Sequence, residues 1–216
     1  MKISAVIFDM DGTVLADEDE YGLAFKKVLE NLGAKVDTDY PQTGGIGVKE
    51  NWPGLLKKYK VRTGKTFDEL ASETQKEYLK LLDKVTLKPG VEDFIKSLRA
   101  DGIKIGLATS NVWFILEKVF EKFPIEKLFD SVTTGEEVVN KKPAPDLFLK
   151  AAEKLGSEVG ECLVIEDAPS GIKAAHAAKM KVIAVSRNSK QAEILKDADL
   201  VTNSYTQLTT SKVKQI

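Results

Sequence analysis

From residue 89 onward, short apolar runs alternate with longer segments in which apolar residues recur at helical spacing. The runs at 103–108, 131–133, 163–165 and 182–185 indicate strands, and 199–201 is expected to add an edge strand. The segments at 90–100, 112–122, 145–155, 170–178 and 190–196 indicate helices. Strands that alternate with helices pair in parallel through right-handed crossovers. Together with the apolar run at 3–8, this pattern predicts an α/β fold with a doubly wound, Rossmann-like parallel sheet.

The stretch between the first strand and residue 85 has a different pattern. Helical spacing recurs at about 21–32, 48–59 and 67–82, and no strand pattern interrupts it. We therefore predict an α/β core domain of residues 1–16 and 85–216 and an all-helical domain of residues 17–84 inserted into it. The linkers near 15–19 and 84–89 are expected to act as hinges when the helical domain closes over the core.

Composition and charge narrow the class of protein. The chain has 216 residues, and its 32 Lys and Arg balance 33 Asp and Glu, without the basic excess typical of nucleic-acid binding. No apolar stretch approaches the ~18 residues that span a bilayer. A single cysteine, Cys162, fits a reducing compartment. We expect a cytoplasmic protein with no nucleic-acid or membrane partner, a monomer or weak homo-oligomer, whose polar end from residue 206 frays.

The sequence Asp9-Met10-Asp11-Gly12-Thr13 follows the first apolar run directly. In an open α/β sheet, ligands bind in the crevice beyond the carboxyl ends of the strands. Two carboxylates one residue apart at that point suit a reaction in which one attacks phosphorus and the other moves a proton. The alternative is a plain turn, since Asp and Gly also end strands for local reasons.

Three further polar clusters lie where strands of the predicted sheet end. They are Thr109-Ser110-Asn111, Glu166-Asp167, and Lys142 ahead of the helix at 145–155. Each alone is explained by a helix cap or a solvated lysine, but in a parallel sheet all of them meet Asp9 and Asp11 at one edge. Four carboxylates packed together need a cation, and Mg²⁺ prefers such oxygen ligands. Lys142 and the Thr109 hydroxyl would hold phosphate oxygens during phosphoryl transfer.

These four ordered motifs resemble those of the haloacid dehalogenase superfamily of aspartate-dependent phosphotransferases. The likeness is greatest to the branch with a helical cap that contains β-phosphoglucomutase and small sugar-phosphate phosphatases, and it spans residue 3 to about residue 185. The resemblance identifies the inserted helices as the cap. It implies an aspartyl-phosphate on Asp9, with Asp11 as the general acid and then the base.

The resemblance also implies a Mg²⁺ ion held by Asp9, the backbone carbonyl of Asp11 and Asp167, with Glu166 close to the metal. Asn111 lies where relatives touch the phosphate or the substrate. The predicted site residues are Asp9, Asp11, Thr109 and Lys142 for catalysis; Asp9, Asp11, Glu166 and Asp167 for the metal; and Gly12, Ser110, Asn111 and Lys49 for the substrate.

Two reactions of this branch remain open, hydrolysis and phosphosugar isomerisation. β-Phosphoglucomutase uses a cap histidine about a dozen residues beyond the nucleophile, but residues 16–22 contain none, and the only histidine is His176. We therefore predict a Mg²⁺-dependent phosphatase, with a mutase as the alternative. A 2-haloacid dehalogenase is less expected, because such enzymes typically lack counterparts of Asp11 and of the metal. A non-catalytic phosphate-binding module is disfavoured, because competent residues occupy every catalytic position.

The cap is expected to select the substrate, which we predict to be a small phosphorylated metabolite such as a sugar phosphate. Lys49 lies where relatives often place a substrate-contacting residue, although a solvated helix face explains it equally well. A basic cluster follows at Lys57, Lys58, Lys60, Arg62 and Lys65. A solvated face is the simpler interpretation of that cluster.

Overall fold

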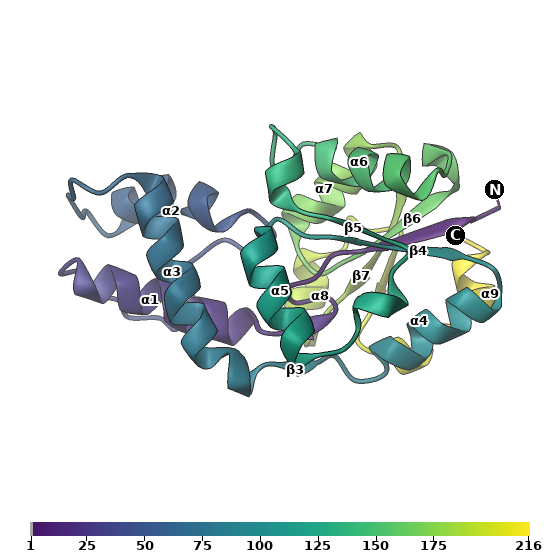
Figure 1. The fold of residues 1–216 in the computed structure, drawn as a ribbon, viewed down its shortest axis with the longest axis horizontal. Coiled ribbons are helices and arrows are strands. Elements are labelled where there is room, and N and C mark those ends of the chain that lie inside the picture. Colours follow the sequence, from purple (N-terminus) through teal and green to yellow (C-terminus); the bar gives the residue numbers. More distant parts are fainter. Residues whose placement is uncertain (1) are drawn as a thin grey trace.

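A computed structural model describes residues 2–216 and contains one sheet of six strands in the order β5-β4-β1-β6-β7-β8 (Figure 1). These strands are β1 Ala5–Phe8, β4 Lys104–Ala108, β5 Ser131–Thr133, β6 Cys162–Glu166, β7 Lys181–Val185 and β8 Leu200–Thr202. All neighbouring strands pair in parallel. The chain moves outward from β1 to β5, then crosses to the other side for β6, and this reversal opens a crevice beyond central β1. The predicted doubly wound α/β fold is confirmed.

Helices cover both faces of the sheet (Figure 1). Successive strand residues point to opposite faces, so Ala5 and Ile7 join the apolar cluster of α6 and α7, whereas Val6 and Phe8 join that of α4 and α5. Because both faces are buried, the strands are almost continuously apolar and lack an alternating pattern. These helices are α4 Val91–Ala100, α5 Trp113–Lys122, α6 Asp146–Leu155, α7 Pro169–Ala177, α8 Ser189–Ile194 and α9 Thr210–Val213.

Three α-helices within residues 18–81 form a separate layer at the left of Figure 1, here called the helical insert. They are α1 Glu18–Asn31, α2 Val48–Lys58 and α3 Phe67–Leu81. α3 contacts both α1 and α2, and the side chains of Trp52 and Tyr78 are fully buried. α3 begins with a capping box in which Thr66 and Glu69 each bond the other's backbone N–H. The bounds agree with the predicted helices to within about one turn.

The two connections between the helical insert and the sheet run side by side as a short antiparallel ribbon. Its strands are β2 Leu15–Ala16 and β3 Thr86–Leu87, with Leu15 opposite Leu87 and Ala16 opposite Thr86. The sequence analysis did not predict this ribbon, because two residues are too few to produce a periodic pattern. It lies within the two linkers that were expected to act as hinges.

The C-terminal stretch packs against the core, in contrast to the prediction that it frays from residue 206. Leu208 and Val213 are buried, and the hydroxyl of Tyr205 donates to the backbone carbonyl of Thr13 at 3.0 Å. The Tyr205 ring lies 5.6 Å from that of Phe94 on α4. A few apolar anchors therefore hold a segment of polar composition. Of the helices in residues 2–216, none combines the length and apolarity needed to cross a membrane.

Candidate active site

Asp9 is the first residue after β1, and its backbone N–H continues the sheet by donating to Ile165 O at 2.9 Å. Its buried carboxylate accepts a hydrogen bond from Lys142 Nζ. Burial raises the pKa of Asp9, Lys142 lowers it, and Glu166 and Asp11 raise it again, so that the pKa lies well above its usual value. The nucleophile predicted from the sequence is thus held against a cation in a site largely closed to water.

Lys142 is fully buried and bridges two carboxylates. Besides Asp9, its Nζ donates to Glu166 Oε1 at 2.8 Å. Burial alone lowers the pKa of Lys142, but Asp9 and Glu166 outweigh this effect and raise it. The second oxygen of Glu166 accepts the backbone N–H groups of Asp167 and Ala168 at 2.7 and 2.6 Å. Both oxygens of Glu166 therefore have partners, and this residue orients Lys142.

Asp11 is held by two residues from the end of β4. Asn111 Nδ2 lies 3.1 and 2.9 Å from the two Asp11 oxygens, and the Thr109 hydroxyl donates to Oδ2 at 3.3 Å. Tyr21 of α1 donates to Asn111 Oδ1 at 2.9 Å, so the helical insert contacts this network directly. Burial raises the pKa of Asp11, although its hydrogen bonds oppose that rise. A raised pKa favours the protonated carboxyl that a general acid requires.

Asp17 is a site residue that the sequence analysis missed. It precedes α1, where its residue type is typical of a helix cap, yet its side chain makes no cap hydrogen bond. Instead its oxygens accept from the backbone N–H of Gly12 at 3.0 Å and from the Tyr78 hydroxyl at 2.8 Å. Burial raises the pKa of Asp17, and the neighbouring Asp11 adds to the rise. Asp17 therefore joins α3 of the helical insert to the loop after β1.

Tyr78→Phe is expected to destabilise the fold by about 1–2 kcal/mol, because it leaves a buried carboxyl oxygen of Asp17 without its donor. The same change at Tyr59 is the matched control: its hydroxyl is buried without a partner, so Tyr59→Phe is expected to be neutral or slightly stabilising. Urea unfolding of both variants measures the difference. Equal effects would show that the Tyr78–Asp17 bond contributes nothing to stability.

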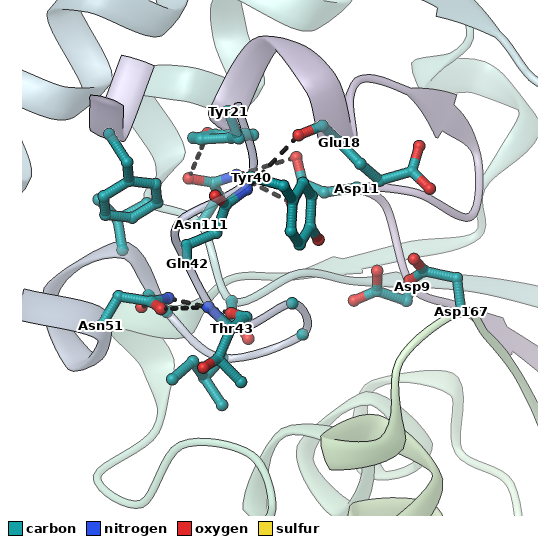
Figure 2. Close-up of a pocket in the computed structure, with 17 residues that line it drawn as sticks. Asp9, Asp11, Glu18, Tyr21, Tyr40, Gln42, Thr43, Asn51, Asn111 and Asp167 are labelled. Atoms are coloured by element: carbon teal, nitrogen blue, oxygen red, sulfur yellow. Dashed lines mark hydrogen bonds between the residues drawn. The ribbon is translucent and has the colours of Figure 1, made fainter. Parts of the chain in front are cut away.

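Asp167 stands beside Asp9 at the carboxyl end of β6 (Figure 2). Its Oδ1 accepts from the Thr13 hydroxyl at 3.4 Å, and its pKa is raised by burial and then by Glu166 and Asp9. A Cβ on Gly12, whose φ is +75°, would lie 2.2 Å from Asp167 Oδ2. The glycine lets the chain turn against this carboxylate. Two neighbouring buried carboxyls with raised pKa values fit a divalent cation, which would favour their ionised forms.

The four predicted metal ligands are not assembled as one cage. Among residues 2–216, no group of three or more His, Cys, Asp and Glu side chains is arranged to hold a metal ion. Glu166 is occupied by Lys142 and two backbone N–H groups, and the Asp11 side chain by Asn111 and Thr109. The ligand predicted from Asp11 is its backbone carbonyl, which these side-chain bonds do not involve. Asp9 and Asp167 remain, which is sufficient for Mg²⁺, because this ion is commonly held by one or two carboxylates plus water and phosphate oxygens.

A cavity lies between the sheet edge and the helical insert (Figure 2). Its lining includes Asp9, Asp11, Asp167, Ser110 and Asn111 from the core and Glu18, Tyr21, Phe25, Tyr40, Gln42, Asn51 and residues 43–48 from the helical insert. Of the predicted substrate residues, Ser110 and Asn111 thus face the cavity, whereas Gly12 does not line it but packs against the lining residue Asp167. The sequence analysis missed the contributions of Tyr21, Tyr40 and Gln42.

Lys49, predicted to contact the substrate, does not line the cavity. Its ammonium pairs with Asp68 of α3 at 2.7 Å on the surface. Val48 and Asn51 of the same helix do face the cavity. In an α-helix, residues three apart share a face, and the residue next to one of them points about 100° away. The helix rotation therefore turns Lys49 outward.

Residues 6–185 match the model of the haloacid dehalogenase-like hydrolase family. The chain belongs to this family, and the predicted family is confirmed.

Two relatives are much longer than this chain. It is 34% identical over 205 residues to the Arabidopsis thaliana protein SUPPRESSOR OF QUENCHING 1, chloroplastic, covering 91% of this chain and 19% of that protein. It is 31% identical to the bifunctional riboflavin kinase/FMN phosphatase of the same plant, covering 93% of this chain and 53% of the relative. The chain thus spans less than two thirds of either protein.

Other similar proteins match over most of their length. β-Phosphoglucomutase of Bacillus subtilis is 31% identical, with 96% of this chain and 92% of the relative covered. A phosphorylated carbohydrates phosphatase of Thermotoga maritima is 30% identical, with 84% of each covered. The crystal structure of β-phosphoglucomutase from Clostridium difficile superposes with a TM-score of 0.87 at 28% identity, covering 99% of this chain and 96% of that one.

Proposed function

We propose that this protein is a Mg²⁺-dependent phosphatase that hydrolyses a small phosphate monoester through an aspartyl-phosphate on Asp9. The observation that carries the proposal is the contact between Lys142 and the buried carboxylate of Asp9, which lies two residues before Asp11. It fixes a positive charge beside the nucleophile, where the transferring phosphoryl group carries its negative charge. The similarity to a phosphorylated carbohydrates phosphatase supports this class of reaction.

In the first proposed step, an oxygen of Asp9 bonds to phosphorus while the bond to the leaving oxygen breaks, and Asp11 gives that oxygen a proton. In the second, Asp11 takes a proton from water, the water oxygen attacks phosphorus, and phosphate leaves as the Asp9 carboxylate is restored. Asn111 and Thr109 orient Asp11 throughout. Asp9, Asp167 and the backbone carbonyl of Asp11 would hold Mg²⁺, which would supply charge neutralisation for the phosphate.

We further propose that residues 17–84 act as a cap domain on a core of residues 1–16 and 85–216. The hydrogen bonds from Tyr21 to Asn111 and from the Gly12 backbone N–H to Asp17 support this role, because they join the helical insert to core residues next to Asp11. A closed cap excludes water before the chemical step. The compartment and oligomeric state expected from the sequence stay predictions.

The alternative is a phosphosugar mutase, and the similarity to β-phosphoglucomutase supports it. Tyr21 occupies the position about a dozen residues beyond the nucleophile, and burial raises its pKa well above its usual value. A neutral phenol is a poor proton acceptor at pH 7. The histidine, His176, is on α7 and contacts Asp199 at the surface. Both observations favour hydrolysis.

Phosphate release from p-nitrophenyl phosphate is expected to need Mg²⁺, to stop in EDTA and to return with excess Mg²⁺. Asp167→Asn removes one proposed ligand and is expected to raise the Mg²⁺ concentration for half-maximal activity about tenfold or more. Asp37→Asn, an exposed change of the same type, is the control. Activity that persists in EDTA would reject the metal. Conversion of β-glucose 1-phosphate to glucose 6-phosphate without phosphate release would favour the mutase.

A further inference from the structure

The part of the cavity formed by the helical insert contains buried acceptor atoms without partners. Glu18 Oε1 and Gln42 Oε1 are both buried and make no hydrogen bond, and both residues line the cavity (Figure 2). The side chain of Glu18 is only 10% exposed. Buried polar atoms in folded proteins nearly always have partners. Two orphan acceptors in one cavity therefore indicate a ligand that donates hydrogen bonds there.

The charged side chains that line this cavity are all acidic. Within residues 2–216, neither lysine nor arginine lines the cavity. Lys88 approaches Glu18 from outside the lining and reaches only Oε2, at 3.4 Å. Arg187 pairs with Asp19 and likewise does not line the cavity. Arg187 Cζ lies 5.5 Å from the ring centroid of the lining residue Tyr40, but like Lys88 it is already paired with a carboxylate. A second anionic group on the substrate would thus find no unpaired cation in the lining and would face the Glu18 carboxylate in a partly desolvated site.

We infer that the substrate of this site carries a single phosphate on a neutral, hydroxyl-rich leaving group, and that Glu18 and Gln42 select it by accepting its hydroxyl protons. This inference rests on the proposed phosphatase function and specifies its substrate class. The amide of Gln42 is held in place because its Nε2 donates to the backbone carbonyl of Glu18 at 3.4 Å. The opposite amide end is thereby left to face the ligand. The Glu18 carboxylate would repel the second anionic group of bisphosphates and phosphorylated carboxylic acids.

A matched pair of esters tests the inference. Sorbitol 6-phosphate and 6-phosphogluconate differ only at C1, where a hydroxymethyl group is replaced by a carboxylate. We expect kcat/KM for sorbitol 6-phosphate to exceed that for 6-phosphogluconate at least tenfold. Each ester is also assayed as a competitor of p-nitrophenyl phosphate, where the sorbitol ester should be the stronger inhibitor. Equal or reversed preference, or no competition by either ester, would overturn the inference.

Glu18→Gln identifies the residue responsible. It removes the charge and keeps the size, so the preference for the sorbitol ester is expected to fall at least tenfold. Glu30→Gln, at the exposed far end of the same helix, should leave the preference unchanged. An unchanged preference in Glu18→Gln would reject its role. If p-nitrophenyl phosphate is hydrolysed but the preference is wrong, only this inference fails, whereas no hydrolysis of any ester would reject the phosphatase itself.

Discussion

Asp9→Asn is expected to lower kcat for phosphate release by about 10⁴-fold or more, the size of loss seen when a catalytic nucleophile is removed. The amide is a far weaker nucleophile than the carboxylate. The substitution also replaces one carboxylate oxygen that is proposed to bind Mg²⁺. Steady-state phosphate release, with Mg²⁺ and p-nitrophenyl phosphate in excess, measures the effect. Asp37→Asn should retain full activity.

The same substitution is expected to keep the fold intact. Asp9 lies among carboxyls whose burial and mutual repulsion raise its pKa, so a neutral side chain relieves charge repulsion there. Lys142 retains Glu166 as a partner at 2.8 Å. The urea midpoint of Asp9→Asn should therefore be no lower than that of the wild type. Mg²⁺-dependent activity in a folded Asp9→Asn variant would exclude Asp9 as the nucleophile.

Lys142→Met is expected to destabilise the protein by about 3–5 kcal/mol, because it leaves Asp9 and Glu166 as buried carboxyls without their cation. For a chain of this length, that corresponds to a fall in Tm of roughly 6 to 20 °C. Activity should also be lost, since the phosphate would have no fixed positive charge to bind. Thermal unfolding and phosphate release on the same preparation measure both effects.

A double substitution separates charge from packing. If the loss comes from uncompensated charge, Glu166→Gln added to Lys142→Met should recover part of the stability, because one buried carboxyl is removed. Lys150→Met on α6, where the lysine pairs with Glu153 at the surface, is the matched control and should change stability by less than about 1 kcal/mol. A similarly small effect of Lys142→Met would mean that the buried pairs do not stabilise the fold.

The core part of the site was predictable because of topology. Parallel strands bring their carboxyl ends to one edge of a sheet, so residues that follow three separate apolar runs had to converge there. Asp9, Asn111 and Asp167 meet at that edge in the structure. No detail of side-chain packing was needed for this prediction, because short apolar runs bounded by polar residues fix both the strands and their ends.

The part contributed by the helical insert was less predictable, because it depends on helix rotation and on distant pairs. Lys49 faces away because burial of Trp52 on the same helix sets the rotation of α2. Asp17 bonds Tyr78, which lies 61 residues further along the chain. Its position before a helix made a local cap the simpler interpretation. No local sequence pattern predicts a hydrogen bond between residues so far apart in the chain.

The β2–β3 ribbon has a consequence for how the core tolerates its insertion. Because Leu15 lies opposite Leu87, the chain leaves and re-enters the core at neighbouring points. The residues between β2 and β3 therefore act on the core as one long loop, whose ends are held together by the pairing of these two strands. The entropic cost of closing a loop grows only slowly with its length. We therefore expect the core to accept inserts of very different size at this position, so that new specificities can arise by exchanging the insert while the residues at the strand ends stay unchanged.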